Sequence, residues 1–429
     1  MEHSPELPHC SFCPGPGGEK TAISNFSLAD RVSVGSIYSN PSTPTAPRKE
    51  SALLMIYMDN AATSFPKAPG VGEAMQYYVN QIGVNINRSV YASAQEAGLE
   101  TLSLREKLSD FFGHKDPNCV LLTSGATAAL NLGIKGFLKS GDHVLVSSME
   151  HNAVMRPLVQ MGVSFDRIPC DREGFLDIDA IPTLIRPNTR LLVLCHGSNV
   201  CGTIQDAEAV GELCKLHSIA FLLDAAQTAG HISIDFRKWN LSALAVPGHK
   251  GLLGPQGIGA LLVSKEFAAD LNPIIAGGTG SMSDSEELPP YLPDRFESGT
   301  PNLPGIYGWS AAMDYVNQTF THRHQRETYL TELFLKGLES LPHVQLIGTK
   351  NLSRRVGVIA LDFLRRDNAE AADDLERKYE ILTRCGLHCA PSAHKTLGTF
   401  PRGVVRFSIG YNTAEEDVLC ALSALEALS

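Results

Sequence analysis

The chain has 429 residues, of which 43% are hydrophobic and 19% charged, and its formal net charge is −10. This composition is typical of a globular protein with enough chain for a large core. The acidic balance, without a basic stripe, argues against a nucleic-acid partner. No apolar stretch approaches the ~18 residues of a membrane span, so we expect no membrane partner.

The ten cysteines are scattered along the chain, and Cys119 and Cys195 lie inside apolar stretches. Scattered cysteines of this kind do not form a disulfide framework, so we expect reduced thiols in a cytoplasmic protein. The N-terminal residues contain no basic segment followed by an apolar run, which predicts no secretory signal.

Residues 1–52 are rich in Ser and Pro and have neither a helical nor a strand period, which predicts a disordered N-terminal extension. This extension contains Cys10 and Cys13, spaced like half of a zinc site. No second pair follows nearby in the sequence, which favours a flexible tail over a metal site. We assign no role to the extension and expect no metal in the protein.

After residue 55, short apolar runs alternate with helical ones. The predicted strands are 120–122, 143–147, 191–195, 219–223, 244–246 and 259–263, and the predicted helices are 124–137, a segment from 151, and 207–217. This alternation predicts an α/β fold with a mostly parallel sheet covered on both faces. A long helix after residue 310 and a mixed segment beyond it predict a large domain over 53–310 and a smaller C-terminal domain over 311–429.

Polar candidates follow several of these predicted strands. They are Ser124–Thr127, Glu150–His151, Asn199, Asp224 and His249–Lys250. Ligands of such sheets collect at the carboxyl ends of the strands, so we expect these residues to share one site.

Asp224 ends a buried apolar run, and Lys250 lies in the glycine-rich segment Pro247-Gly248-His249-Lys250-Gly251-Leu252. These are the two polar contacts that pyridoxal phosphate requires. A lysine amine binds its aldehyde covalently, and a carboxylate keeps its pyridine nitrogen protonated. An N-cap Asp and a surface Lys are the alternatives. The apolar loop disfavours a surface lysine, and desolvation there would lower the pKa of the amine.

Ser124-Gly125-Ala126-Thr127 lies between a strand and a helix, where small residues and the helix dipole favour a phosphate. A plain Ser124 N-cap is the alternative, and the order of this segment ahead of Asp224 and Lys250 favours the phosphate. His151 begins a helix, where it could stack on a cofactor ring or move protons. A capping or surface role is its alternative.

Cys389 lies in a loop between His388 and Ala390, where an exposed and partly ionised thiol would be reactive. A small buried hydrophobe, or a metal or redox pair with Cys385, are the alternatives. Arg406, inside a strand-like run, needs an anionic partner, which is either a substrate carboxylate or a structural ion pair.

Together these stretches resemble the class V aminotransferase group of pyridoxal-phosphate enzymes, and within it the cysteine desulfurases. The resemblance covers about residues 56 to 427, and its carriers are the segments 58–63, 123–127, 150–152, 198–203, 224–227, 248–250 and 297–302, with Arg406. The segment 386–391 is similar to the short active-site loop of the SufS-like desulfurase and selenocysteine lyase branch.

The resemblance implies a fold-type-I transferase with a mostly parallel seven-stranded sheet and a smaller α+β C-terminal domain. It also implies a homodimer with the site at the interface and pyridoxal 5'-phosphate as the cofactor. For the cofactor ring, the resemblance implies that Lys250 binds covalently, Asp224 pairs with the pyridine nitrogen, Gln227 contacts the ring hydroxyl and His151 stacks on the ring. For the phosphate, it implies contacts from Ala126, Thr127 and His249. It also implies that Thr279 reaches the cofactor of the neighbouring subunit.

For the substrate, the resemblance implies that Asn199 and Arg406 bind the carboxylate and that Lys250, His151 and Cys389 are catalytic. The implied reaction takes sulfur from L-cysteine, leaving L-alanine and a persulfide on Cys389 for an acceptor protein or thiol, as in iron–sulfur cluster assembly. A selenocysteine lyase and a non-catalytic partner in cluster assembly are the alternatives. Transamination or kynurenine hydrolysis would leave Cys389 unexplained.

Two positions depart from the family pattern. Pro247 stands where many desulfurases have a hydroxyl residue that bonds the phosphate, and Tyr91 stands where many relatives have a histidine. Phosphate binding must therefore rest on the other groups.

Overall fold

The computed structural model describes residues 55–86 and 91–428. The predicted extension over 1–52, with Cys10 and Cys13, lies outside these ranges. None of the helices in these ranges combines the length with the apolar character that a membrane span requires.

A seven-stranded sheet forms the centre of the larger part of the molecule, with the strand order β2-β8-β7-β6-β5-β3-β4. Neighbouring strands are parallel except at β8, which is antiparallel to both β2 and β7. The strands are β2 Val120–Thr123, β3 His143–Ser147, β4 Ser164–Ile168, β5 Thr189–Cys195, β6 Ala220–Asp224, β7 Ala243–Pro247 and β8 Gly259–Val263. The predicted mostly parallel sheet is confirmed.

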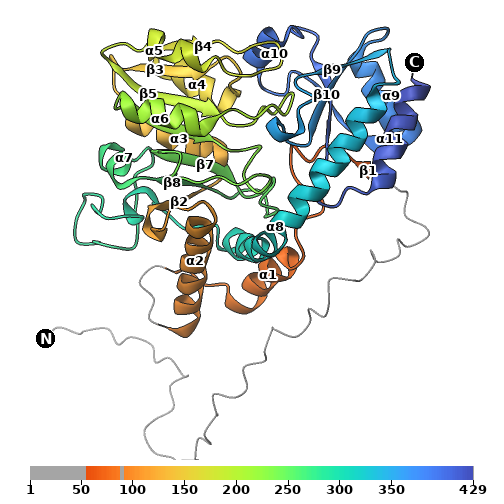
Figure 1. The fold of residues 1–429 in the computed structure, drawn as a ribbon. Helices are drawn as coiled ribbons and strands as arrows, with labels where there is room; N and C mark the ends of the chain where they lie inside the picture. Colours follow the sequence, from red (N-terminus) through yellow and green to blue (C-terminus); the bar gives the residue numbers. More distant parts are fainter. Residues whose placement is uncertain (1–54, 87–90, 429) are drawn as a thin grey trace, which may run out of the picture. The chain divides into compact units, whose positions relative to one another are not determined.

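Helices cover both faces of this sheet (Figure 1). In β6, Phe221 and Leu223 belong to one core cluster with Trp309, whereas Leu222 belongs to a second cluster with Leu130 and Val154. This alternation follows from the two-residue period of a strand. The helices are α1 Val71–Tyr77, α2 Ala92–Phe111, α3 Ala126–Phe137, α4 Asn152–Met161, α5 Ile181–Leu184, α6 Ala207–Leu216, α7 Lys265–Asp270 and α8 Leu303–Leu338.

The sequence did not predict α2 or β4. In α2 the helical period is blurred, because Leu99 and Leu102 are exposed while Arg105 and Ser109 are buried. Strand β4 carries polar residues and lies at the edge of the sheet, where one side of a strand has no neighbour to bury it.

The C-terminal part contains a four-stranded antiparallel sheet in the order β12-β13-β10-β9. Its elements are β9 Val344–Ile347, β10 Val358–Phe363, α9 Asn368–Tyr379, β11 Ile381–Leu382, β12 Arg384–Gly386, α10 Pro391–Leu397, β13 Val404–Ser408 and α11 Glu415–Ala427. A separate apolar core joins this sheet to α9, α11 and the second half of α8.

Helix α8 connects the two cores over 36 residues. Trp309 and Met313 pack into the core of the large sheet, and Leu330 and Phe334 pack into the C-terminal core. The predicted boundary at 310–311 therefore falls inside one helix. The first strand, β1 Ile56–Tyr57, pairs with β11 of the C-terminal part. The division into two domains stays a prediction.

Candidate active site

A cavity of about 350 Å³ lies at the carboxyl ends of the central strands. Its lining includes eight of the predicted site residues: Ala126, Thr127, His151, Asn199, Asp224, Gln227, His249 and Lys250. These residues follow β2, β3, β5, β6 and β7, so the sheet brings together side chains that are far apart in the sequence.

One side of this cavity is the N-terminus of α3. The N-cap is Gly125, with φ 147°, and no described side chain caps the helix. The Ser124 cap is therefore wrong as an alternative. The first N–H groups of a helix have no acceptor within the helix, so those of Ala126, Thr127 and Ala128 are available to an anion.

His249 lines the cavity and belongs to a polar cluster that the sequence did not reveal. Its Nδ1 lies 3.1 Å from Thr63 Oγ1, and Lys67 Nζ donates to Thr63 Oγ1 at 2.9 Å and to the His249 carbonyl at 3.0 Å. Burial lowers the pKa of Lys67 to about 8 and that of His249 to about 4. The cluster thus places the amine of Lys67 next to His249. Pro247 also lines the cavity but offers no polar donor.

Asp224, the last residue of β6, is buried, with an exposed fraction of 3%. One of its oxygens accepts the N–H of Ala226 at 2.9 Å, but no described helix begins here, so the N-cap alternative is wrong. Burial raises the pKa of this carboxyl, and the hydrogen bond and the nearby Lys250 charge oppose that rise. Such a carboxylate gains most from a cationic donor inside the cavity. Gln227 Nε2, beside it, donates to the Ala61 carbonyl at 2.9 Å.

Lys250 follows β7 on a loop with no room for larger residues. A Cβ at Gly248 would lie 2.9 Å from Ile258 Cγ2, and one at Gly251 would lie 2.4 Å from the Ala229 carbonyl oxygen. Burial lowers the pKa of Lys250 to about 8. The surface-lysine alternative is therefore wrong, because the amine lies among buried groups with a larger neutral fraction than an exposed lysine has.

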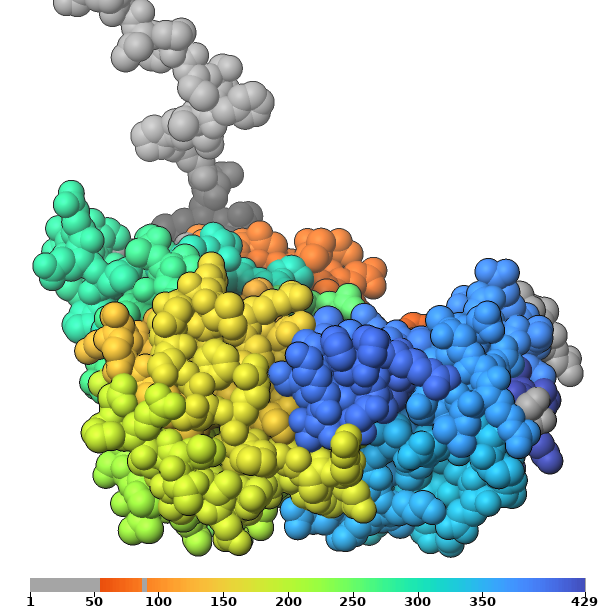
Figure 2. Space-filling view, turned by 90° about the horizontal axis from the view of Figure 1, so that it is seen from above, coloured from red at the N-terminus to blue at the C-terminus, as the bar shows by residue number. Residues whose placement is uncertain are grey.

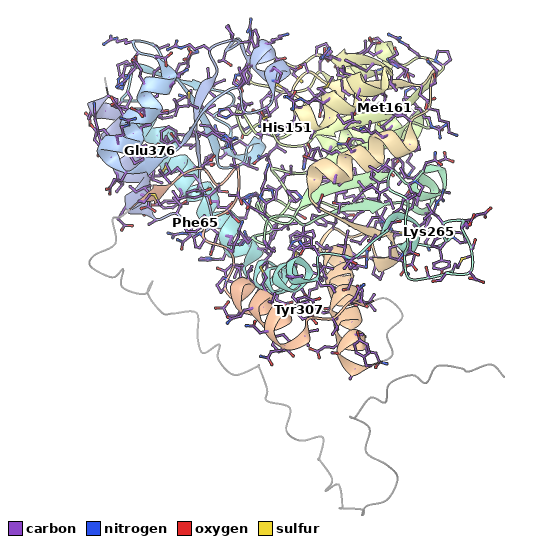
Figure 3. The ribbon with its side chains drawn as sticks, turned by 180° about the vertical axis from the view of Figure 1, so that it is seen from behind. Phe65, His151, Met161, Lys265, Tyr307 and Glu376 are labelled. Atoms are coloured by element: carbon purple, nitrogen blue, oxygen red, sulfur yellow. The ribbon has the colours of Figure 1, made fainter. Side chains whose placement is uncertain are left out.

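His151 fulfils both sequence interpretations, because it caps α4 and lines the cavity. Its Nδ1 accepts the N–H of Ala153 at 3.0 Å, so the proton of the neutral ring is on Nε2. Burial, followed by the Lys250 charge, lowers the pKa of His151 to about 4. In Figure 3 its label lies between the segment of α4 and the C-terminal part.

Glu150, the residue before His151, is fully buried. Its Oε1 accepts from Ser147 Oγ at 2.5 Å and from the N–H of Cys195 at 2.8 Å. Burial raises the pKa of Glu150 to about 8. Cys195, which the sequence predicted only as a thiol in an apolar stretch, also lines the cavity.

Arg406 is not among the residues that line the cavity. Its Nη2 pairs with Asp59 Oδ1 at 2.7 Å, and its Nη1 donates to the Asn199 carbonyl at 3.0 Å. Arg406 therefore forms the ion pair named as its alternative, and its contact with a substrate carboxylate stays a prediction. Arg384, opposite Arg406 across β12 and β13, is a second cation that the sequence did not identify.

Cys389 is exposed, so the buried-hydrophobe alternative is wrong. Its carbonyl accepts the N–H of Asn152 at 2.8 Å, which brings its loop to the start of α4. Figure 2 shows the segment after this loop packed against the segment after β3, where Thr396 Oγ1 donates to Ser148. Cys385 is half-buried on β12, and the described residues contain no cluster of three metal-binding side chains.

Thr279 lines a second cavity, of about 420 Å³, instead of the first. Its Oγ1 lies 2.9 Å from Ser281 Oγ. The implied contact with a partner subunit's cofactor stays a prediction. Tyr91 is exposed at the start of α2.

The first cavity fits pyridoxal phosphate at three points. The uncapped N-terminus of α3 suits a phosphate, the buried Asp224 suits a protonated pyridine nitrogen, and the Lys250 amine suits an aldehyde. All three line the same space.

The chain matches the family model of class V aminotransferases over residues 56–420. It is 31% identical to a probable cysteine desulfurase of Pyrococcus abyssi, and the match covers 87% of this chain and 94% of the relative. The structure is similar to that of a cysteine desulfurase from Thermococcus onnurineus, with a TM-score of 0.81, 31% identity, and coverage of 87% and 94%. It is also similar to the cysteine desulfurase CsdA of Escherichia coli, with a TM-score of 0.77, 26% identity and the same coverage.

The family match spans both sheets and every residue that lines the first cavity. The relatives match over nearly their whole length, so the likeness includes the cavity and the loop of Cys389 together. The chain therefore belongs to the class V aminotransferases, and within them to the cysteine desulfurases, a family of pyridoxal-phosphate enzymes.

Proposed function

We propose that this chain is a cysteine desulfurase that takes sulfur from L-cysteine, releases L-alanine and holds the sulfur as a persulfide on Cys389. One observation carries the proposal. The exposed Cys389 lies on a loop bonded to the start of α4, directly beside His151 and the cavity that contains Lys250 and Asp224. A transamination site has no use for such a thiol.

The cofactor contacts are proposed from the cavity. Ala126, Thr127 and His249 would hold the phosphate, Asp224 would hold the pyridine nitrogen in its protonated form, and Gln227 would contact the ring hydroxyl. Lys250 would bind the aldehyde. Bound pyridoxal phosphate supplies an electron sink for the charge that develops at the substrate Cα.

Lys250 and His151 would handle protons. The lowered pKa of Lys250, about 8, places its amine near the range in which a general base works at neutral pH. We propose that Lys250 Nζ takes the proton from the substrate Cα. His151 is neutral at pH 7 because its pKa is about 4, so its ring can stack on the cofactor without adding a positive charge.

Cys389 would complete the reaction. Its thiolate attacks the substrate sulfur, so an S–S bond forms as the C–S bond breaks. The electron pair of the broken bond returns to the substrate carbon, which takes up a proton and becomes the methyl group of alanine. The thiol and cysteine together contain all atoms of the persulfide and alanine, so no external oxidant is needed. A protein or small thiol would later accept the sulfur by exchange.

Arg406 is proposed to bind the substrate carboxylate. It lies next to Asn199 of the cavity lining, and its guanidinium already pairs with a carboxylate, that of Asp59. A substrate carboxylate would present the same chemical group.

Thr279 is proposed to serve a partner subunit in a homodimer. A cytoplasmic location is proposed from the cysteines between Cys119 and Cys420, all of which are free thiols.

The test compares sulfide and alanine formation from L-cysteine with a reductant for the wild type and Cys389→Ala. We expect activity to fall by at least about 100-fold in Cys389→Ala, because the nucleophile is gone. Cys420→Ala is the matched control, since Cys420 is also exposed, and it should keep full activity.

Full sulfur transfer by Cys389→Ala would overturn the role of Cys389. If the wild type shows the visible absorbance of bound cofactor but forms no sulfide, L-cysteine is the wrong substrate. Selenocysteine, which the same residues would accept, is then the next amino acid to test.

A further inference from the structure

The loop that presents Cys389 is a tight turn with an unfavourable backbone. The N–H of Ala390 donates to the Leu387 carbonyl at 2.9 Å, and the two central residues, His388 and Cys389, have φ angles of 46° and 58°. Positive φ at both central positions is the pattern of a type I′ turn, which strongly prefers Asn-Gly. His and Cys are disfavoured there, so the turn needs support from outside.

Two hydrogen bonds from the cavity side provide this support. Asn199 Nδ2 donates to the His388 carbonyl at 2.7 Å, and the backbone N–H of Asn152 donates to the Cys389 carbonyl at 2.8 Å. Asn152 is the first residue of α4, so its N–H has no acceptor within the helix and is free to bond the loop. Both central carbonyls of the turn are therefore held.

The bond from Asn199 also fixes the orientation of its amide. A carbonyl accepts, so the group that faces His388 must be the NH₂. The other atom, Oδ1, is buried and has no hydrogen-bond partner among the described residues. The NH₂ group has two N–H donors, and the His388 carbonyl takes one of them. The geometry thus ties Asn199 to the loop of Cys389, a role beyond the one that the family resemblance implies.

We propose that Asn199 and the N–H of Asn152 form a two-point clamp that fixes the position of the Cys389 thiol. Asn199 is then a positioning residue, which acts through the loop, and its carbonyl bond to Arg406 links the clamp to the proposed substrate site. The inference rests on the proposed function only for what Cys389 does. The clamp itself is a statement about the loop.

The first test is hydrogen–deuterium exchange of the holoenzyme over residues 387–390. Asn199→Ala removes one hydrogen bond of the clamp. We therefore expect the Ala390 amide to exchange at least about fivefold faster, which is the effect of losing the net stabilisation of one hydrogen bond. Asn188→Ala is the matched control, because Asn188 Nδ2 also bonds a backbone carbonyl, that of Gly141, far from the loop. It should leave this exchange unchanged.

A second variant removes the other bond. Asn152→Pro deletes the N–H but suits the first position of a helix, and the preceding His151 has the extended φ of −73° and ψ of 155° that a following proline requires. It should accelerate exchange at Ala390 as Asn199→Ala does. Unchanged thermal unfolding and cofactor absorbance would show that either variant is folded.

Steady-state kinetics with L-cysteine separate positioning from binding. Because a displaced nucleophile slows the transfer step, Asn199→Ala should lower kcat by roughly 10- to 100-fold with little change in KM. A raised KM with wild-type exchange would overturn the clamp and make Asn199 a substrate contact. Faster exchange in a protein whose wild type forms no persulfide on Cys389 would support the clamp and reject the proposed function.

Discussion

At the scale of single residues, Lys250 gives the sharpest pH dependence. Its amine must be neutral to react with an aldehyde, and burial lowers its pKa to about 8. The neutral fraction rises with pH up to this value and then levels off. We expect the rate at which the cofactor-free protein takes up pyridoxal phosphate to rise towards pH 8 and to reach a plateau above it. Stopped-flow measurement of the visible absorbance at each pH tests this.

Asp224 supplies the control for this prediction. Its negative charge raises the pKa of Lys250, although by less than burial lowers it. Asp224→Asn should therefore shift the midpoint of the uptake profile to lower pH, by about one unit. Uptake by the wild type that keeps rising to pH 10 would mean that Lys250 behaves as a solvated lysine.

At the scale of elements, the contact between β8 and the start of α3 decides whether the phosphate end of the cavity forms. A Cβ on Gly259 would lie 2.6 Å from Gly125 Cα and 2.7 Å from the Val246 carbonyl oxygen. Neither backbone atom can move without displacing a strand or the helix start. We expect Gly259→Ala to lower the free energy of unfolding by about 2 kcal/mol and to weaken cofactor affinity at least about tenfold. Urea unfolding and cofactor titration measure the two effects.

Gly98 provides the comparison. It lies inside α2, and within the described part of the chain no atom outside this helix lies within 4 Å of a Cβ built on it. Gly98→Ala should stabilise the protein by about 0.5–1 kcal/mol and leave cofactor affinity unchanged, because alanine is the better helix former. If both substitutions had the same effect, the close approach at Gly259 would not be responsible.

At the scale of the whole molecule, buried histidines predict loss of stability in acid. The pKa is lowered to about 4 for His151, His249 and His394, and to about 3 for His196 and His388. In the unfolded chain they bind protons near pH 6.5, so the unfolded state binds more protons below that pH. The contribution of these histidines to the free energy of unfolding is therefore fully present above pH 6.5 and is lost as the pH drops towards 4. The raised pKa of Glu150, about 8, and that of Asp224 act in the opposite direction, but these are two groups against five histidines.

His196→Gln tests this prediction in the cofactor-free protein. His196 Nδ1 lies 2.9 Å from Thr228 Oγ1, a contact that a glutamine amide can replace. The variant should lose roughly 3 kcal/mol less stability between pH 6.5 and pH 4 than the wild type does. Urea unfolding at each pH measures the slope, with the exposed His217→Gln as the control. Equal slopes in all three proteins would contradict the assignment.

The sequence by itself determined the alternation of strands and helices, the lysine–aspartate pair and the loop of Cys389. These features depend on local properties: apolar runs mark buried strands, and Gly248 and Gly251 mark a tight turn of the backbone. The same local signals were too weak for α2, whose inward face contains the buried Arg105 and Ser109. A period that mixes polar and apolar residues on one face cannot be recognised without the partner that buries it.

The tertiary structure decided how distant side chains pair. Lys67 contacts His249, Asp59 neutralises Arg406, and Asn199 bonds the loop of Cys389 across 189 positions of sequence. Such bonds depend on which strand ends lie side by side in the sheet, and residue spacing does not encode that order. The sequence thus identified the chemical groups of the site, and the fold determined which of them contact the cavity, which contact each other and which hold the thiol in place.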